Sequence, residues 1–311
     1  MNCLVTGAAG FIGGALTKKL VGEGHHVKAV IHNKKPNFFH KNVEYVQANI
    51  TDLSSLKKIN DRYDAVFHCA AYVKDFGYKK NFIKINLEGT KNIVKICPDI
   101  KCFIYLSHIL YESDNQYGNY TLSKYLAEQY LQKKYKKDKF PVVIIRPGNV
   151  YGPCATTWVL RPLHAINRNK ILLIDKGKGI FHHTYIDNLI DAIMIAVKNP
   201  NICGQTFDIT DGDHSITWYR YFNDLAKIAN KKPINKNISK KTALIIARLM
   251  VFIYYITGIK PIITPTAVNI LTNKKEISIN KAKEILNYQP KIDYNKGIIE
   301  VKKWLLEEKI V

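Results

Sequence analysis

Short apolar runs alternate with amphipathic segments through the first half of the chain. The apolar runs cover residues 2–5, 26–31, 43–47, 65–69, 102–106 and 142–145, and they predict buried strands. Between them, apolar residues recur at helical spacing through Leu16, Leu20 and Val21, and again over residues 54–62, 82–96 and 120–137. Strands that alternate with helices in this way predict a parallel, doubly wound α/β sheet.

A glycine-rich turn separates the first strand from the first helix and reads Thr6-Gly7-Ala8-Ala9-Gly10-Phe11-Ile12-Gly13. Gly7 permits a sharp turn, Gly10 lets phosphates approach the backbone, and Gly13 lets the helix pack on the strand. The helix N-terminus then offers N–H groups and the positive end of its dipole to an anion. With a second strand at the expected spacing, the pattern favours a dinucleotide site over a plain strand–turn–helix packing element.

The alternation loosens past residue 151. Residues 184–197 have a helical pattern and residues 205–209 a short strand pattern, and both are expected to return to the sheet. The remainder is mostly helical and ends in a helix over residues 294–309. We therefore expect a dinucleotide-binding domain over residues 1–150, completed by 185–210, and a smaller substrate-binding region over 151–311.

The chain carries 47 Lys and Arg against 25 Asp and Glu, a formal charge of +22. Only six of these basic residues are Arg, and the Lys residues are spread along a chain also rich in Asn and Ile, which indicates an AT-rich coding bias. Nucleic acid is therefore not an expected partner, because specific recognition favours Arg. The six cysteines show no paired or metal-ligand spacing, so we expect a reducing, cytoplasmic protein with no disulfide and no metal. The first residues already belong to a strand, so no signal peptide is expected.

Tyr120 and Lys124 lie four residues apart, on one face of a predicted helix. A hydride-transfer site needs a proton donor or acceptor beside the reacting carbon, and a nearby ammonium and an oxidised nicotinamide would both lower a tyrosine pKa from its usual ~10. Two further pairs have the same spacing: Tyr130 with Lys134, and Tyr135 with Lys139. Tyr120 is preferred because it begins its helix near the carboxyl end of the preceding strand, where ligands bind. The alternative is a helix-start tyrosine with a solvated lysine.

In sequence order, five motifs together resemble the extended short-chain dehydrogenase/reductase superfamily, within it the NAD-dependent epimerase/dehydratase family. They are Thr6-Gly7 to Gly13, His68-Cys69-Ala70-Ala71, Asn86-Leu87-Glu88-Gly89-Thr90, Tyr120 with Lys124, and Arg146-Pro147-Gly148-Asn149-Val150-Tyr151-Gly152. The resemblance covers nearly the whole chain. It implies a Rossmann-type fold with a smaller, mostly helical C-terminal substrate domain, an NAD(P)-dependent dehydrogenase or reductase, and a homodimer.

The resemblance also implies residue roles. The pyrophosphate would be bound by Gly7, Gly10, Phe11, Ile12 and Gly13. Asn49 and Ile50 stand where relatives usually have an Asp and an apolar residue beside the adenine. The cofactor would be lined by Ala70, Ala71, Tyr72, Pro147 and Val150, with Asn86 supporting the loop beneath it. Tyr120 and Lys124 would complete the cofactor site, where Lys124 can hydrogen-bond the ribose, while Asn149 and Tyr72 would face substrate.

The chain departs from the family pattern at two places. The catalytic Ser or Thr of relatives aligns with His108, and Ser107 stands just before it. Either side chain could hydrogen-bond a substrate oxygen, and His can also relay a proton; otherwise the hydroxyl role is lost. Second, residues 109–119 form a shorter connection than in most relatives, which would open the site or remove substrate contacts.

The end of the second strand bears on the choice of coenzyme. A carboxylate there selects NAD, whereas a basic residue accommodates the 2′-phosphate of NADP. The stretch Val30-Ile31-His32-Asn33-Lys34-Lys35 contains no acid, and His32 and Lys34 are the candidate phosphate contacts. NADP(H) is therefore favoured over NAD(H), unless these lysines merely belong to the general Lys excess.

Residues 243–257 form the most apolar segment outside the predicted strands, with Arg248 near the middle. The segment is short for a bilayer span, which needs ~20 residues. Three interpretations remain open: a core helix, a lid over a lipid-like substrate, or peripheral attachment to a membrane surface. Together with Pro261 and Pro265, this segment resembles the branch that contains 3β-hydroxysteroid dehydrogenases and bacterial 3-ketoacid reductases.

The leading hypothesis is an NADP(H)-dependent oxidoreductase that interconverts a secondary alcohol and a ketone on a sterol-like or β-keto acyl substrate. In it Tyr120 exchanges the proton, Lys124 tunes it, and Ser107 or His108 positions the substrate oxygen. An alternative is a nucleotide-sugar epimerase, dehydratase or reductase, with candidate diphosphate clamps at Arg161, Arg168 and Arg220. A third is a cofactor-binding regulator without turnover.

Overall fold

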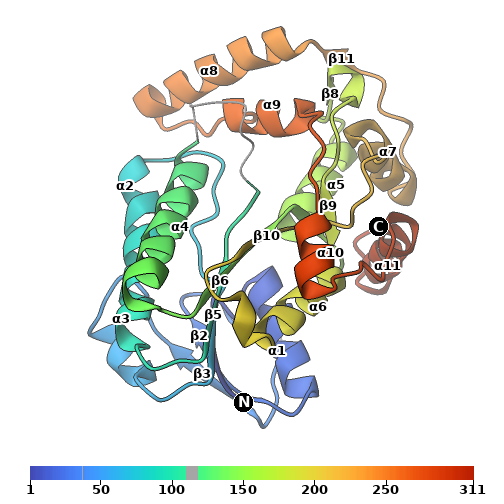
Figure 1. Cartoon of the computed structure of the whole chain (residues 1–311). Coiled ribbons are helices and arrows are strands. Elements are labelled where there is room, and N and C mark those ends of the chain that lie inside the picture. The colour runs from blue at the N-terminus through green and yellow to red at the C-terminus, as the bar shows by residue number, and fades with distance from the viewer. Residues whose placement is uncertain (37, 110–117) are drawn as a thin grey trace. The chain divides into compact units, whose positions relative to one another are not determined.

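Seven parallel strands form the central sheet of the computed structural model, in the order β10-β6-β5-β4-β1-β2-β3 (Figure 1). Their bounds are β1 Asn2–Thr6, β2 His26–Ile31, β3 Val43–Gln47, β4 Ala65–His68, β5 Cys102–Leu106, β6 Val142–Pro147 and β10 Thr206–Ile209. The structure describes residues 1–36, 38–109 and 118–311. The predicted doubly wound α/β class is confirmed, and the strand order reverses between β1 and β4, which is where this fold binds ligands.

The chain divides into two units. Unit 1 comprises Met1–Pro147, Leu189–Ile209 and Ile279–Gln289, and it contains the whole seven-stranded sheet. Unit 2 comprises Gly148–Asn188, Thr210–Ser278 and Pro290–Val311.

The central strands are mostly apolar because both faces of the sheet are covered. All residues of β4 and β5 are buried, whereas every residue of β3, at the edge, is partly buried or exposed. Helices α3 (Gly89–Ile96) and α4 (Asn119–Asp138) cover one face, through side chains that include Ile93 and Leu131. Helix α1 (Phe11–Gly22) lies with α6 (Ile186–Val197), joined by an ion pair between Lys19 and Asp191 of 3.9 Å.

Three predicted helices differ from the observed ones. The segment predicted over 82–96 is α2 (Lys79–Phe82), a π-helical turn (Ile83–Glu88) and α3. The one predicted over 54–62 is a short 3-10 helix, Ser55–Ile59. The one predicted to begin at Thr184 begins instead at Ile186, because β9 (His183–Tyr185) pairs with β7 (Asn149–Tyr151) and holds Thr184 in extended backbone.

Unit 2 is mainly helical. Beside the β7–β9 pair it contains a second short parallel pair, β8 (Leu173–Ile174) with β11 (Asn237–Ile238). Its helices are α5 Arg161–Asn167, α7 Trp218–Ile228, α8 Lys240–Thr257, α9 Pro265–Thr272 and α11 Tyr294–Glu307; α10 (Asn280–Leu286) belongs to unit 1. The starts of four are fixed by side chains that accept a backbone N–H bond, namely Thr217, Ser239, Thr264 and Asp293.

The apolar segment 243–257 falls within α8, and the core-helix interpretation of it is wrong. Only Ala243 and Ala247 are fully buried in this helix. Leu244 packs beside them and is partly buried, whereas Ile245, Leu249, Phe252 and Ile256 are exposed. No helix in the described ranges is both long and apolar enough to cross a bilayer.

Candidate coenzyme and catalytic site

The glycine-rich turn between β1 and α1 is shaped for an anion. Gly7 has φ +72°, and a Cβ built there would lie 2.8 Å from the Ala70 backbone. A Cβ on Gly13 would lie 2.3 Å from the Gly7 carbonyl oxygen, so helix and turn are in backbone contact. Helix α1 begins at Phe11 after Gly10, and within the described ranges it has neither a side-chain cap nor an acid in its first turn. Its first N–H groups and dipole are therefore available to a pyrophosphate.

The residues predicted beside the adenine are held by local contacts. The Asn49 side-chain oxygen accepts from the Thr51 amide (3.0 Å) and hydroxyl (2.9 Å), which makes an Asx-type turn after β3. Ile50 is buried against α3, where a Cβ on Gly89 would lie 2.7 Å from its Cδ1. His32 and Lys34 lie exposed just after β2, as a phosphate contact requires.

Asn86 connects the loop after β4 to the start of α4. Its side-chain oxygen accepts from the Tyr72 amide at 2.6 Å, and its side-chain nitrogen donates to the Ser123 hydroxyl at 2.8 Å. Ser123 in turn donates to the Tyr120 carbonyl at 2.7 Å. The predicted supporting role of Asn86 thus takes a definite form: one buried amide sets the position of the Ala70 to Tyr72 loop against the first turn of α4.

A second buried chain of hydrogen bonds links β1, β4 and α3, and the sequence reasoning missed it. The Thr6 hydroxyl lies 2.7 Å from Nδ1 of His68, and His68 Nε2 lies 3.0 Å from the Thr90 hydroxyl. Because Thr90 donates its own proton to the Asn86 carbonyl (2.6 Å), it accepts from His68 Nε2–H. Burial and the Lys124 charge lower the pKa of His68 to about 3, so the imidazole is neutral. The sequence feature that could have indicated this hydrogen-bonded chain is His68, the one polar residue in the otherwise apolar strand β4.

Lys124 is buried, which separates it from the two competing pairs. Its ammonium donates to the Leu106 carbonyl at the end of β5 and lies 4.1 Å from the centroid of the Tyr105 ring. Burial lowers the pKa of Lys124 to about 7, and the Glu128 carboxylate opposes this shift. By contrast, Lys134 pairs with Asp138 at the surface. The interpretation of Lys124 as a solvated lysine is therefore wrong.

Glu128 is a further residue that sequence reasoning missed. It lies one turn beyond Lys124 and is buried, and it accepts from Arg146 Nε at 3.0 Å. This pair joins α4 to β6, so it holds the helix that carries both Tyr120 and Lys124 against the sheet.

Tyr120 and His108 meet at the carboxyl end of β5. Their rings stack with centroids 5.1 Å apart and planes inclined by 29°. Burial raises the pKa of Tyr120 to about 12, so the lowering expected from a nearby ammonium is absent in the protein alone. Burial accounts for this rise, and the Lys124 ammonium donates to the Leu106 carbonyl.

Ser107 and His108 both present polar atoms without partners. In the part of the chain that the structure describes, Ser107 Oγ and His108 Nε2 are buried and make no hydrogen bond. Burial, followed by the Lys124 and Arg146 charges, lowers the pKa of His108 to about 3, while a bond to the Ile109 backbone raises it. A hydrogen bond that raises the pKa is one that the ring donates. Because Nε2 has no partner, we infer that Nδ1–H donates to the Ile109 backbone and that Nε2 carries the free lone pair. Of the short connection over 109–119, residues 110–117 lie outside the described ranges.

The predicted residues after β6 fall on both units. Pro147 ends unit 1, whereas Asn149 and Val150 begin β7 in unit 2. The Asn149 amide donates to the His182 carbonyl at 2.7 Å, and its buried Nδ2 has no partner within the described residues.

The arginines proposed as diphosphate clamps lie in unit 2, and Arg220 is already engaged. It donates to Asn295 Oδ1 at 2.6 Å, lies 3.8 Å from Asp224, and covers the Tyr294 ring at 4.9 Å. Arg161 and Arg168 are exposed at the two ends of α5.

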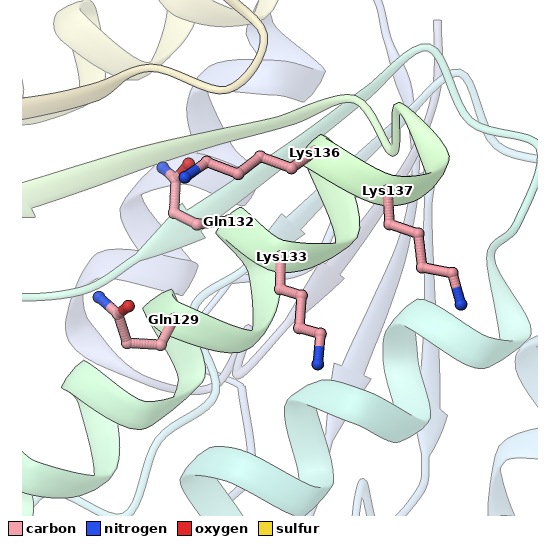
Figure 2. Close-up of a pocket in the computed structure, with 5 residues that line it drawn as sticks. All are labelled: Gln129, Gln132, Lys133, Lys136 and Lys137. Atoms are coloured by element: carbon pink, nitrogen blue, oxygen red, sulfur yellow. The ribbon is translucent and has the colours of Figure 1, made fainter.

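A hollow of about 410 Å³ lies on α4, and Figure 2 draws the residues that line it. It is lined by Gln129, Gln132, Lys133, Lys136 and Lys137. Gln132 Nε2 donates to the Gly204 carbonyl (3.1 Å) and to the Thr206 hydroxyl (3.2 Å). The hollow begins more than one turn beyond Lys124, so we interpret it as a solvated helix face.

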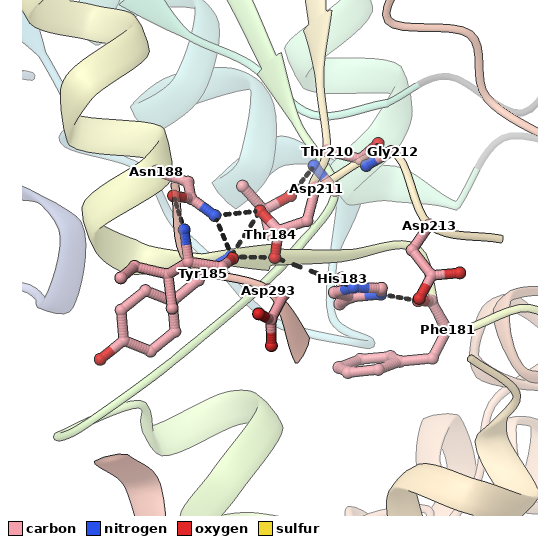
Figure 3. A network of polar contacts seen from close by, with 12 residues as sticks. Phe181, His183, Thr184, Tyr185, Asn188, Thr210, Asp211, Gly212, Asp213 and Asp293 are labelled. Atoms are coloured by element: carbon pink, nitrogen blue, oxygen red, sulfur yellow. Dashed lines mark hydrogen bonds and ion pairs between the residues drawn. The ribbon is translucent and has the colours of Figure 1, made fainter. Parts of the chain in front are cut away.

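A buried carboxyl in unit 2 is another feature that sequence reasoning missed. Figure 3 shows Asp211 accepting from the Tyr185 amide (2.9 Å) and from Asn188 Nδ2 (2.8 Å). Burial raises the pKa of Asp211 to about 7. Asn188 Oδ1 accepts from the amides of Lys291 and Ile292, both at 3.0 Å, so the network fixes the chain that leads into α11.

Three relatives place this geometry in context. Sterol-4-alpha-carboxylate 3-dehydrogenase, decarboxylating, of Candida albicans is 25% identical over 99% of this chain and 98% of its own length. The 2-alkyl-3-oxoalkanoate reductase of Stenotrophomonas maltophilia is 24% identical over 97% and 98%. The solved Thermus thermophilus UDP-glucose 4-epimerase, in complex with NAD, matches with TM-score 0.76 and 18% identity over 98% and 99%, which shows the shared fold.

The model of the NAD dependent epimerase/dehydratase family matches residues 3–209, which span the glycine turn, the Tyr120–Lys124 helix and every strand of the sheet. The cradle at Gly7 and Gly13 and the uncapped start of α1 fit the pyrophosphate of the coenzyme that this family binds. The prediction of an NAD(P)-dependent enzyme is confirmed at this level: the chain belongs to the NAD-dependent epimerase/dehydratase family.

Proposed function

We propose that the protein is an oxidoreductase that interconverts a ketone and a secondary alcohol on an apolar substrate of the sterol or β-keto acyl class. The grouping of Tyr120, His108 and buried Lys124 at the carboxyl end of β5 carries this proposal. The names of the sterol dehydrogenase and oxoalkanoate reductase relatives support the substrate class. The engagement of Arg220 within its own unit argues against a nucleotide-sugar diphosphate clamp at that residue.

The bound coenzyme supplies or accepts the hydride at the carbinol carbon. Because the pKa of Tyr120 is about 12, its phenol holds its proton at neutral pH and can donate it to a ketone oxygen. The resulting phenolate takes a proton back from solvent, and an ammonium on Lys124, one turn away on α4, favours that phenolate. In the alcohol direction the same phenolate accepts the hydroxyl proton.

Ser107 and His108 offer the substrate oxygen one hydrogen-bond donor and one acceptor. The Ser107 hydroxyl can donate to a substrate oxygen, whereas the bare Nε2 of His108 can only accept. A ketone would use the Ser107 donor, and an alcohol could use both. The His that replaces the family hydroxyl therefore adds an acceptor to the site, next to a serine that keeps the donor.

For the coenzyme we propose NADP(H). Its support is the pair His32 and Lys34, both exposed after β2 in a stretch without an acid. The variant with His32→Asp should shift the ratio of Kd values toward NAD(H), and Lys41→Glu, an exposed lysine before β3, serves as its control. An unchanged ratio in the His32 variant would contradict the proposal that the end of β2 selects the coenzyme.

Purified protein should reduce 3-ketosteroids or 2-alkyl-3-oxo acids with NADPH, followed by loss of the coenzyme absorbance. Tyr120→Phe should lose at least about 10²-fold in kcat and keep its coenzyme Kd, because only the transferred proton is removed. Tyr130→Phe, on the same helix with the same spacing to a lysine, should keep its activity. Equal turnover in the Tyr120 variant would contradict the proposed role.

The competing hypotheses give different results in the same assays. Protection against unfolding by UDP or dTDP, with no turnover of apolar ketones, would identify a nucleotide-sugar enzyme. Coenzyme binding without hydride transfer to any carbonyl compound would identify a regulator.

A further inference from the structure

Helix α8 in unit 2 exposes many of its larger apolar side chains to solvent and buries two alanines. The residues it buries are small: Ala243 and Ala247 pack with Ile174 and Val268. Figure 1 shows α8 and α9 running side by side, and the two helices are in contact. Leu244 packs against the same cluster and is partly buried. The two alanines let the helices approach closely, and most of the larger side chains of α8 are only partly buried or exposed.

Four of the larger side chains form an exposed stripe. Ile245, Leu249, Phe252 and Ile256 are each more than half exposed. Their spacing of four, three and four residues places them in a single line along the helix. Past the helix end, Ile259 and Ile262 are also exposed, by 65% and 80%. Contiguous apolar surface of this kind marks an interaction site.

The charge around the stripe has one sign. Residues 225–275 contain ten Lys and Arg and no Asp or Glu. Lys241 lies four residues before Ile245, and Arg248 lies four residues before Phe252, so both basic side chains border the stripe, and both are exposed. The complement to such a surface is apolar in its centre and anionic around it.

We propose that the α8 stripe docks on the surface of an anionic lipid bilayer, with the helix lying in the plane of the interface. The apolar stripe would enter the boundary of the acyl chains, and Lys241, Arg248 and Lys260 would contact headgroup phosphates. An 18-residue helix is about 27 Å long at 1.5 Å per residue, and Arg248 in its middle suits the interface and not the bilayer core.

The charge also argues against a second copy of this chain as the occupant. Two copies that met through α8 would bring Lys241, Arg248 and Lys260 of each against those of the other, with no acid in residues 225–275 to separate them. Like charges at an interface disfavour that pairing. Anionic phosphates are the complementary partner.

The test uses the full chain and vesicles of phosphatidylcholine, alone or mixed with phosphatidylglycerol, in a flotation assay. At low salt the mixed vesicles should bind the protein at least about tenfold more tightly, and high salt should remove most of the difference. No binding to the mixed vesicles, or equal binding to both kinds, would overturn the proposal.

Two matched pairs of variants locate the contact. Ile256→Asn should weaken binding about tenfold, since one apolar side chain no longer enters the boundary. Ile299→Asn, an equally exposed isoleucine on α11, should bind like the parent chain. Arg248→Glu should weaken binding similarly, and Lys302→Glu on α11 much less.

All four variants should retain coenzyme binding and thermal unfolding midpoints, because their side chains are exposed. Equal losses in the α8 variants and their α11 controls would show that binding is not specific to α8 and would overturn the docking site. So would a dimer in solution that Ile256→Asn dissociates, since it would make a second copy the occupant.

Discussion

The His108 imidazole lies against the Tyr120 ring in a stacked arrangement, and its Nε2 is buried without a hydrogen-bond partner in the described residues. The ring face and the nitrogen lone pair can be separated by substitution. One contributes packing that orients the phenol, and the other contributes an acceptor close to where a substrate oxygen would sit.

His108→Phe keeps an aromatic ring on Tyr120 and removes Nε2. We expect kcat for oxidation of the alcohol to fall by about 10²-fold with no change in coenzyme Kd, because Nε2 accepts only from the substrate hydroxyl. His108→Ser, which restores a hydroxyl, should retain more activity than His108→Phe. Full activity in the Phe variant would show that the ring serves only to pack.

Gly13 and Gly22 lie in the same helix and should respond oppositely to alanine. A Cβ on Gly13 would lie 2.3 Å from a backbone oxygen, so Gly13→Ala should abolish measurable coenzyme binding and cost about 1–3 kcal/mol of unfolding free energy. Gly22 has nothing within 4 Å, and Gly22→Ala should gain up to about 1 kcal/mol. Urea unfolding and coenzyme titration measure both. Similar behaviour of the two variants would contradict the tight contact.

Lys124→Met should raise the free energy of unfolding and abolish turnover. The pKa of Lys124 falls from 10.5 to about 7, so the unfolded chain holds the proton between these values while the folded protein releases it. The stability of the parent protein therefore rises with pH across that window, and below it the buried ammonium costs the folded state in full.

The variant lacks this dependence. Its advantage in unfolding free energy should shrink by about 4 kcal/mol between about pH 6 and about pH 10, measured by urea denaturation. A constant difference over that range would mean that the ammonium is not desolvated. Turnover should be lost at every pH.

Asp211→Asn should change the pH dependence in the other direction. The pKa of Asp211 rises from 3.8 to about 7, so between these values the unfolded chain is ionised while the folded protein keeps its proton. The parent protein thus loses stability as pH rises through the window. The advantage of the variant should grow by about 3 kcal/mol from about pH 5 to about pH 8.

Asp213→Asn is the control for that measurement. Its carboxyl is exposed, and hydrogen bonds to Ser215 outweigh partial burial and lower its pKa, so its contribution changes only at more acidic pH. A flat difference for Asp211→Asn between about pH 5 and about pH 8 would show that the carboxyl reaches water.

The sheet was predictable from the sequence because its strands are buried on both faces. Strands β2, β3 and β5 begin and end where the apolar runs do. Thr184 was misassigned because the pairing that keeps it extended is with Val150, 34 residues earlier, and no local pattern encodes that partner. Propensity favoured the helix that begins two residues later.

The sequence motifs of the site could be predicted, but the burial and the tertiary contacts of its residues could not. The four-residue spacing of Tyr120 and Lys124 is local, but the burial of Lys124 depends on Leu106 and on the pair of Glu128 with Arg146, which are tertiary contacts. The same holds for α8, whose helical pattern is clear while the side that faces inward is set by α9.

The division of the chain has a consequence for synthesis on the ribosome. When residues up to Pro147 have emerged, β6 is an open edge, because its neighbour β10 lies about 60 residues further on. Unit 2 must likewise wait for Pro290–Val311, whose first amides are held by Asn188. Nascent chains of this protein therefore expose an unpaired strand until late in translation, and a chaperone that shields β-edges should raise its yield.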